Sequence, residues 1–250
     1  MFKLKYGAIV KINLISFVFG LLIASPAFAA IQNIAGTDFD VIYDDTKLGL
    51  FGSPTLAGNN IFFTPNNFKA ESLNGLGIAT TNSTINGMQL VAKGGFKFGS
   101  IDLTEFGDYI LRGADSFVSV NGQLRAFDGA NFAATNTSSS LIVSSATPLN
   151  IIDGSNHDWQ ASASITNSTA SKSGLTGWLS NANIVNITVE NLLTAYTEAG
   201  VGPEQAFIEK KAIGVGLIVT SAVPEPGVWS SLSAGLFLLG MMASRRKNNR

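Results

Sequence analysis

Short segments of alternating polar and apolar residues fill this chain, and they strongly limit the folds open to it. About ten such segments have strand length and follow one another at spacings of roughly 8 to 20 residues. In residues 38–45, for example, Phe39, Val41 and Tyr43 share one parity. Between residues 30 and 222 we find no helical period longer than about two turns. Together with 26 glycines to form turns, this pattern predicts an all-β, antiparallel β-sandwich of jelly-roll type.

Glycine and polar residues are expected to separate the strands. The strongest local prediction is a hairpin in which Asn121-Gly122 joins residues 116–120 to residues 123–127. Both turn residues tolerate the positive φ that a type I′ turn requires. By the same reasoning the sequence predicts a loop up to residue 87, a turn at 106–108, a strand at 183–190 followed by a turn of helix at 192–196, and a closing pair of strands at 205–210 and 213–220.

The N-terminal residues have the organisation of a secretory signal peptide. Three lysines and an apolar run at 12–24 precede Ala27 and Ala29, the small residues at the positions that signal peptidase reads. Residues 1–29 are therefore predicted to be removed after passage through the Sec translocon, which leaves Ala30 as the mature N-terminus. A retained signal anchor is the alternative.

Residues 223–250 combine a rigid motif, an apolar run and a basic end. Pro224 and Pro226 fix their own φ and favour extended conformations before them, so the motif cannot join a helix or a central strand. Residues 227–244 carry no charge and as a helix would span about 27 Å, close to the hydrocarbon core of a bilayer. The basic residues expected to stay in the cytoplasm are Arg245, Arg246 and Lys247. An ordinary tail anchor is the alternative.

This C-terminal arrangement resembles the PEP-CTERM sorting signal of Gram-negative bacteria. By that resemblance, the motif read by the membrane protease-transpeptidase exosortase consists of Val223, Pro224, Glu225 and Pro226. The resemblance implies an inner-membrane intermediate, then processing and display at the cell surface or in a biofilm matrix, in association with exopolysaccharide. The signal covers little more than a tenth of the chain. Residues 43–52, 60–65 and 105–109 also resemble segments of uncharacterised PEP-CTERM proteins, with which no activity is associated.

The central region, residues 30–222, has the size and charge of one exported domain. Its 193 residues can bury a sizeable core. They carry nine Lys/Arg and 16 Asp/Glu, hence a net charge of −7, which disfavours nucleic acid and anionic lipid as partners. The chain has no cysteine. Packing and hydrogen bonds must therefore hold the fold without disulfides, and a cysteine nucleophile is excluded.

Candidate metal ligands and catalytic residues are few. Four carboxylates near the start of the domain suit a hard cation such as Ca²⁺, and this candidate site consists of Asp38, Asp40, Asp44 and Asp45. The alternative is a solvated acidic edge that forms turns. His157 is the only histidine, and no Gly-x-Ser-x-Gly motif accompanies it. Zinc and a serine-hydrolase triad are therefore not favoured, and no cofactor is expected apart from that Ca²⁺.

Aromatic residues offer the other candidate site. Tyr109, Trp159 and Trp178 could form a platform for sugar rings, whereas core packing is the alternative for all three. Glu105 and Glu190 are nominal carboxylates for glycoside hydrolysis, although among 16 acids some pair will always look suitable. The leading hypothesis is a non-enzymatic surface or matrix protein. A carbohydrate-binding module comes second and a glycan-active enzyme third.

Overall fold

The computed structural model of the chain describes residues 31–199 and 202–221. The predicted signal peptide and sorting signal lie outside these ranges, and with them Ala27, Ala29, Val223, Pro224, Glu225, Pro226, Arg245, Arg246 and Lys247. Within the described ranges, no helix combines the length and apolar character that crossing a bilayer requires.

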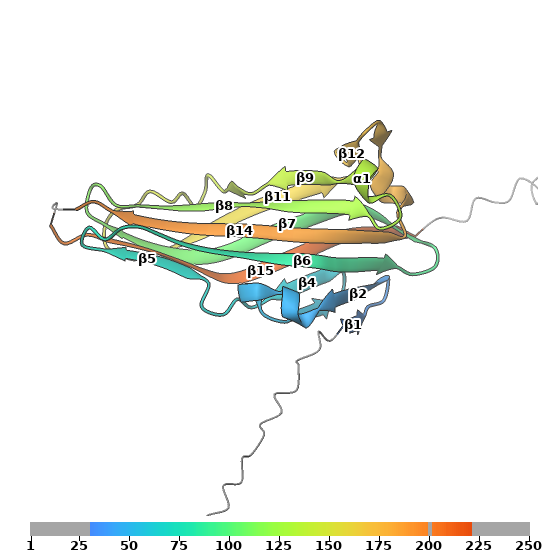
Figure 1. Ribbon diagram of the computed structural model, residues 1–250, viewed down its shortest axis with the longest axis horizontal. Coiled ribbons are helices and arrows are strands. Elements are labelled where there is room, and N and C mark those ends of the chain that lie inside the picture. Colours follow the sequence, from blue (N-terminus) through green and yellow to red (C-terminus); the bar gives the residue numbers. More distant parts are fainter. Residues whose placement is uncertain (1–30, 200–201, 222–250) are drawn as a thin grey trace, which may run out of the picture.

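Two antiparallel sheets stacked face to face form a sandwich (Figure 1). We call the first the β14 sheet; its strands in spatial order are β1 (Ile31–Ala35), β2 (Phe39–Asp44), β6 (Gly77–Ala92), β14 (Ile184–Thr197), β8 (Phe117–Asp128) and β9 (Thr137–Ser140). We call the second the β15 sheet; its strands in spatial order are β10 (Ile142–Val143), β11 (Asn156–Thr166), β7 (Phe96–Arg112), β15 (Gln205–Ser221), β4 (Asn60–Phe63) and β3 (Pro54–Ala57), and β5 (Lys69–Leu73) also pairs with β15. The sandwich class is thus as predicted, and its jelly-roll subclass stays a prediction.

Four long strands give the sandwich its elongated shape. Strands β6, β7, β14 and β15 have 16, 17, 14 and 17 residues, and at about 3.3 Å per residue the longest reach roughly 55 Å. They run along the long axis of the molecule in Figure 1. Two of them, β7 and β15, are direct neighbours in one sheet, and β14 is central in the other. The middle of the sandwich is therefore bounded by long hydrogen-bonded ladders, which β-bulges interrupt in β14 and β15.

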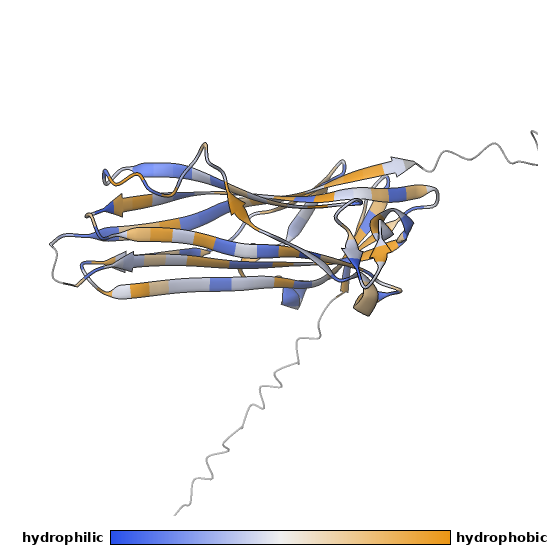
Figure 2. Cartoon of the chain, turned by 90° about the horizontal axis from the view of Figure 1, so that it is seen from above, coloured by the Kyte–Doolittle hydropathy of each residue, from blue (hydrophilic) through white to orange (hydrophobic). Residues whose placement is uncertain are grey.

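The core follows from alternation along these strands. In β14, residues at every second position from Val185 to Thr197 face inward and are buried, while the residues between them are more exposed. Hydrophobic and hydrophilic residues are interspersed along the strands in Figure 2. Because side chains alternate across a strand, each sheet contributes one apolar face to the shared core.

Within residues 31–199 and 202–221, helical structure is confined to short turns. They are η1 (Asp45–Lys47), η2 (Gly49–Phe51), α1 (Phe132–Thr135) and η3 (Trp178–Asn181). The two-residue strands β12 (Ser171–Lys172) and β13 (Leu175–Thr176) form a small hairpin at the end of the sandwich that also carries α1 (Figure 1). Through Phe51, η2 contributes a buried ring to the core.

Two predicted turns are wrong, because strands pass straight through them. Asn121-Gly122 lies inside β8, and the turn predicted around Gly107 lies inside β7. In both places the glycine permits close packing. A Cβ at Gly122 would lie 2.3 Å from the carbonyl oxygen of Glu190, and a Cβ at Gly107 would lie 1.9 Å from that of Glu209. Pairing with neighbouring strands has overridden the local turn preference.

Three other predicted boundaries are also wrong. The loop expected before residue 88 is the first part of β6, and the helical turn expected at 192–196 continues β14. The break expected after residue 210 is a β-bulge within β15, between the pairings of Lys210 and Ala212 with β7. In each case, the position at which a strand was expected to begin or end lies inside a longer strand, at an irregular or polar residue.

Candidate functional site

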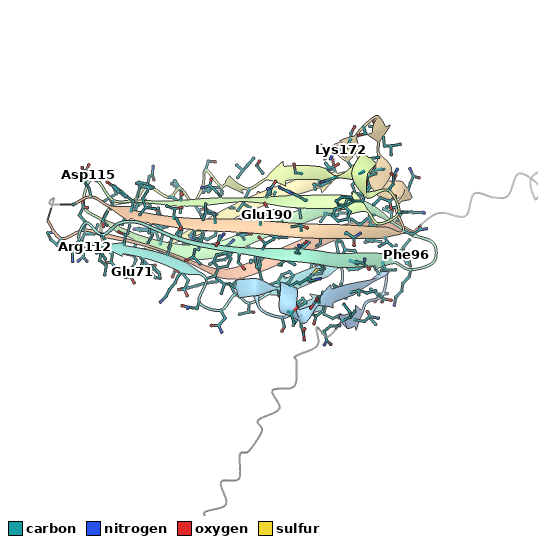
Figure 3. All side chains as sticks on the ribbon, in the orientation of Figure 1. Glu71, Phe96, Arg112, Asp115, Lys172 and Glu190 are labelled. Carbon is teal, nitrogen blue, oxygen red and sulfur yellow. The ribbon has the colours of Figure 1, made fainter. Side chains whose placement is uncertain are left out.

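Three polar side chains meet inside the sandwich, where apolar residues are the rule. They are Glu105 of β7, Asn191 of β14 and Lys210 of β15, with relative exposures of 0%, 3% and 1%. We call them the core triad. Figure 3 labels Glu190 near the middle of β14. Glu190 is partly exposed, whereas its neighbour Asn191, on the opposite face of the strand, is buried in the core. Charged residues are almost never fully buried unless they are paired.

The core triad is closed by three hydrogen bonds. The Nζ of Lys210 donates to Oε2 of Glu105 and to Oδ1 of Asn191. The Nδ2 of Asn191 donates to Oε1 of Glu105 over 2.7 Å. The carboxylate of Glu105 therefore touches both nitrogens, and the amine also touches the amide carbonyl. Pairing of this kind offsets the cost of burying the charges.

Aromatic rings surround the amine of Lys210. Its Nζ lies 5.1 Å from the ring centroid of Phe68, 5.9 Å from that of Trp159 and 6.0 Å from that of Phe51. These rings are themselves buried, so water has little access. Burial lowers the pKa of Lys210 to about 8, and the charge and hydrogen bond of Glu105 oppose that shift.

Backbone irregularity in β15 places Lys210 and Trp159 together. Because of the bulge at residue 211, both Lys210 and Ile213 face the core. The indole Nε1 of Trp159 donates to the carbonyl oxygen of Glu209 over 3.2 Å, so its ring crosses the inner face of β7 at Gly107. Only the missing side chain at Gly107 leaves room for this crossing.

Sequence reasoning missed the core triad as a group, although the parity of the strands could have indicated it. Glu105 shares parity with Leu103 and Tyr109 in β7, and Asn191 shares parity with Val189 and Leu193 in β14. The signal was therefore a polar residue at an inward position in each of three strands. It is hidden because one predicted strand ends at residue 190, just before Asn191, and another ends at Lys210, while Glu105 is interpreted as a nominal carboxylate for glycoside hydrolysis.

The four aspartates proposed as calcium ligands bond mainly with protein groups. Asp38 accepts from Nδ2 of Asn59 over 3.0 Å. Asp40 accepts from the backbone N of Gly36 and pairs with Lys93. Asp44 caps η1, and the pKa of its carboxyl is lowered, chiefly by the hydroxyl of Thr46. Asp45 is exposed at the start of η1. In the described part of the chain, no three acidic or histidine side chains gather as a metal site, so Ca²⁺ stays a prediction.

The proposed aromatic platform is contradicted by burial. Tyr109, Trp159 and Trp178 are 0%, 1% and 5% exposed. Their polar atoms are bonded within the protein: the hydroxyl of Tyr109 donates to the carbonyl oxygen of Pro148 over 2.7 Å, and Nε1 of Trp178 donates to Oγ1 of Thr137 over 3.2 Å. The alternative interpretation, core packing, describes all three rings.

The remaining nominal catalytic residues do not share a cleft. Glu190 faces outward on β14, where it accepts from Nε2 of Gln123 over 2.5 Å and pairs with Arg125, whereas Glu105 lies inside the core. His157 bonds through Nε2 to Asp153 over 2.9 Å. That contact is the main cause of the lowered pKa of the Asp153 carboxyl.

Comparisons with known proteins leave the chain without an assigned family. No protein-family model matches it, and no curated protein matches it. Structures of infectious bursal disease virus are similar at low levels: the Gt strain at 9% identity over 79% of this chain and 56% of the viral chain, TM-score 0.23, and the Gx strain at 7% identity over 77% and 49%, TM-score 0.23. A VP2 subviral particle of this virus matches at 12% identity over 84% and 59%, TM-score 0.18.

These matches carry no argument about fold or function, because their TM-scores are far below 0.5. The chain spans about half the length of the viral chains that it matches.

Two surface hollows lie on the outer faces of the sandwich near the core triad. One, of about 310 Å³, is lined by residues that include Phe106, Asp158, Gln160 and Lys211. The other, of about 350 Å³, is lined by residues that include Asn82, Thr84, Asn121 and Glu190. The first combines an exposed ring, since Phe106 is 44% exposed, with hydrogen-bonding groups. Such a combination suits a sugar ring.

Proposed function

We propose that this protein is an exported structural component of the cell surface or extracellular matrix. It enters the Sec route by its signal peptide, is held in the inner membrane by its C-terminal helix, and is processed by exosortase at the motif beginning at Val223. Association with exopolysaccharide follows from the resemblance to the PEP-CTERM signal. The proposal includes no catalytic activity.

The burial of the core triad supports a structural role for the body. Glu105, Asn191 and Lys210 are all buried between the sheets, with relative exposures of 0%, 3% and 1%. An enzyme needs its acid, base or nucleophile within reach of a bound molecule.

Replacing Pro224 and Pro226 by alanine is expected to stop processing in the host. The alanine chain can continue a helix through the motif, so the extended substrate segment is lost. Membrane fractions should then contain a longer form that retains the C-terminal residues, as intact mass would show. Replacing Pro203, which lies upstream in the body, is the control and should leave processing unchanged. A mature mass unaffected by the double substitution would refute the sorting proposal.

Carbohydrate binding is the second candidate function, and the hollow at Phe106 favours it. The hollow offers an exposed ring beside Asp158, Gln160 and Lys211. We propose this hollow as the carbohydrate-binding face, in place of the buried rings of Tyr109, Trp159 and Trp178 that the sequence suggested.

In a pull-down on polysaccharide from the host matrix, Phe106→Ala is expected to weaken retention about two- to tenfold. The reason is that stacking on an aromatic ring is worth about 0.5–1.5 kcal/mol. Phe62→Ala is the matched control, because Phe62 is 47% exposed on β4 of the same sheet and does not line the hollow. Equal retention of both variants and the unaltered protein would place any binding elsewhere.

A further inference from the structure

The core triad brings together the groups that an amide exchange requires. Lys210 supplies a primary amine and Asn191 a carboxamide, and the amine touches the oxygen of that carboxamide. Glu105 touches the amine through Oε2 and the amide nitrogen through Oε1, the latter over 2.7 Å. In the exchange, Nζ of Lys210 would replace Nδ2 on Cγ of Asn191. Both nitrogens are hydrogen-bonded to the carboxyl group of Glu105.

The surroundings of Lys210 favour the neutral amine, which is the nucleophilic form. Burial among Phe51, Phe68 and Trp159 disfavours charge. With the pKa lowered to about 8, about one molecule in ten carries an uncharged Lys210 at pH 7. Transfer of the proton to Glu105 replaces a buried ion pair by two neutral groups, which a low-dielectric core tolerates better. A desolvated lysine is a recognised way to activate an amine.

The two sheets hold the reacting groups in place. Asn191 is in the middle of β14, which is paired on both sides by β6 and β8. Lys210 is in β15, paired with β7, which carries Glu105. Groups held in contact by rigid ladders react with high effective concentration, and the absence of bulk water protects the product from hydrolysis.

We propose that Lys210 and Asn191 form an intramolecular isopeptide bond that covalently joins the two sheets, with Glu105 as its catalytic acid and base. Nζ of Lys210 attacks Cγ of Asn191, and Glu105 takes the proton that Nζ loses. Glu105 then delivers a proton to Nδ2, the Cγ–Nδ2 bond breaks, and ammonia leaves. The product is a secondary amide between Nζ and Cγ, and no oxidant, metal or cofactor takes part.

The bond would close a ring through residues 191–210 and fix β15 to β14 at the centre of the sandwich. In a chain without cysteine, it would take the place of a disulfide as a covalent brace. The inference goes beyond the proposed function, because it concerns the body alone and stands whether or not exosortase processes the chain.

Peptide mass spectrometry of the folded, full chain tests the proposal. After proteolysis, the segments that contain Asn191 and Lys210 are expected as one branched peptide, lighter by about 17 Da than the sum of the two because ammonia is lost. In the unaltered protein nearly all molecules should carry it. Recovery of the two peptides separately, at unmodified mass, would overturn the proposal. Loss of ammonia without branching, as a succinimide at Asn191 would give, would also overturn it.

Variants separate the role of Glu105 from that of its neighbours. Glu105→Gln is expected to abolish the branched peptide, because the amide cannot move the proton. Glu190→Gln is the matched control. Glu190 precedes Asn191 in β14 but faces outward, so this variant should keep the isopeptide bond. Lys210→Met should likewise give no branched peptide. Persistence of the bond in Glu105→Gln would remove Glu105 from the reaction, and the result for the unaltered protein decides the proposal even if a variant fails to fold.

Discussion

Replacing Gly107 by alanine is expected to prevent the sandwich from folding. The new Cβ would lie 1.9 Å from the carbonyl oxygen of Glu209 and 2.7 Å from the indole atoms Cε2 and Nε1 of Trp159. Neither can retreat: the oxygen belongs to the backbone of the paired strand β15, and the ring is fixed by its hydrogen bond to that same oxygen. A clash with backbone in a close-packed core costs about 4 kcal/mol or more, a large part of the usual stability of a domain.

Urea unfolding followed by tryptophan fluorescence measures this effect, because Trp159 is at the clash. Gly94→Ala is the matched control. Nothing lies within 4 Å of a Cβ placed at Gly94, so that variant should unfold within about 0.5 kcal/mol of the unaltered protein. If Gly107→Ala unfolded at the same urea concentration as Gly94→Ala, the crossing of Trp159 over β7 would be wrong.

Sequence alone predicted the class of fold but not the length of its strands. Alternation of period two identified the inward faces, as at Phe39 and Val41, which are both fully buried. Local rules then ended strands at Gly107 and Gly122, where the structure continues them. Those rules assign a glycine to a turn, and they contain no information about a carbonyl or an indole ring arriving from a strand distant in sequence.

The interruptions that misled the strand prediction converge on the core triad. Gly107 makes room for Trp159, and a Cβ at Gly122 would lie 3.4 Å from Cγ of Asn191. The sequence predicts that one strand ends at residue 190, just before Asn191, and that another ends at Lys210, whereas β14 and β15 continue through both residues. Residues that break local consistency in this way often belong to functional or strained sites, and here they mark the place where the two sheets are joined.

Replacing Glu105 alone by leucine is expected to destabilise the protein more than replacing Glu105 by leucine and Lys210 by methionine together. The leucine leaves Lys210 buried among three aromatic rings with only Oδ1 of Asn191 as a partner. Adding Lys210→Met removes that charge and should recover about 2 kcal/mol or more, because breaking a buried pair costs about 3–5 kcal/mol whereas an apolar replacement of both partners is often neutral. Neither variant can form the isopeptide bond, so urea unfolding of the two isolates the cost of burying the amine.

Glu105→Leu and the variant that also carries Lys210→Met are expected to differ less in their free energy of unfolding as the pH rises from 7 to 10. Burial lowers the pKa of Lys210 to about 8 even while Glu105 opposes the shift, and the leucine removes that opposition. Between the folded-state pKa and the ordinary value of 10.5, the unfolded chain binds more protons than the folded one, so the stability of Glu105→Leu rises with pH by up to about 1.4 kcal/mol per unit. The variant that also carries Lys210→Met lacks this dependence. A gap that stayed constant across this range would mean that Lys210 reaches solvent, and the proposed activation of its amine by burial would then fail.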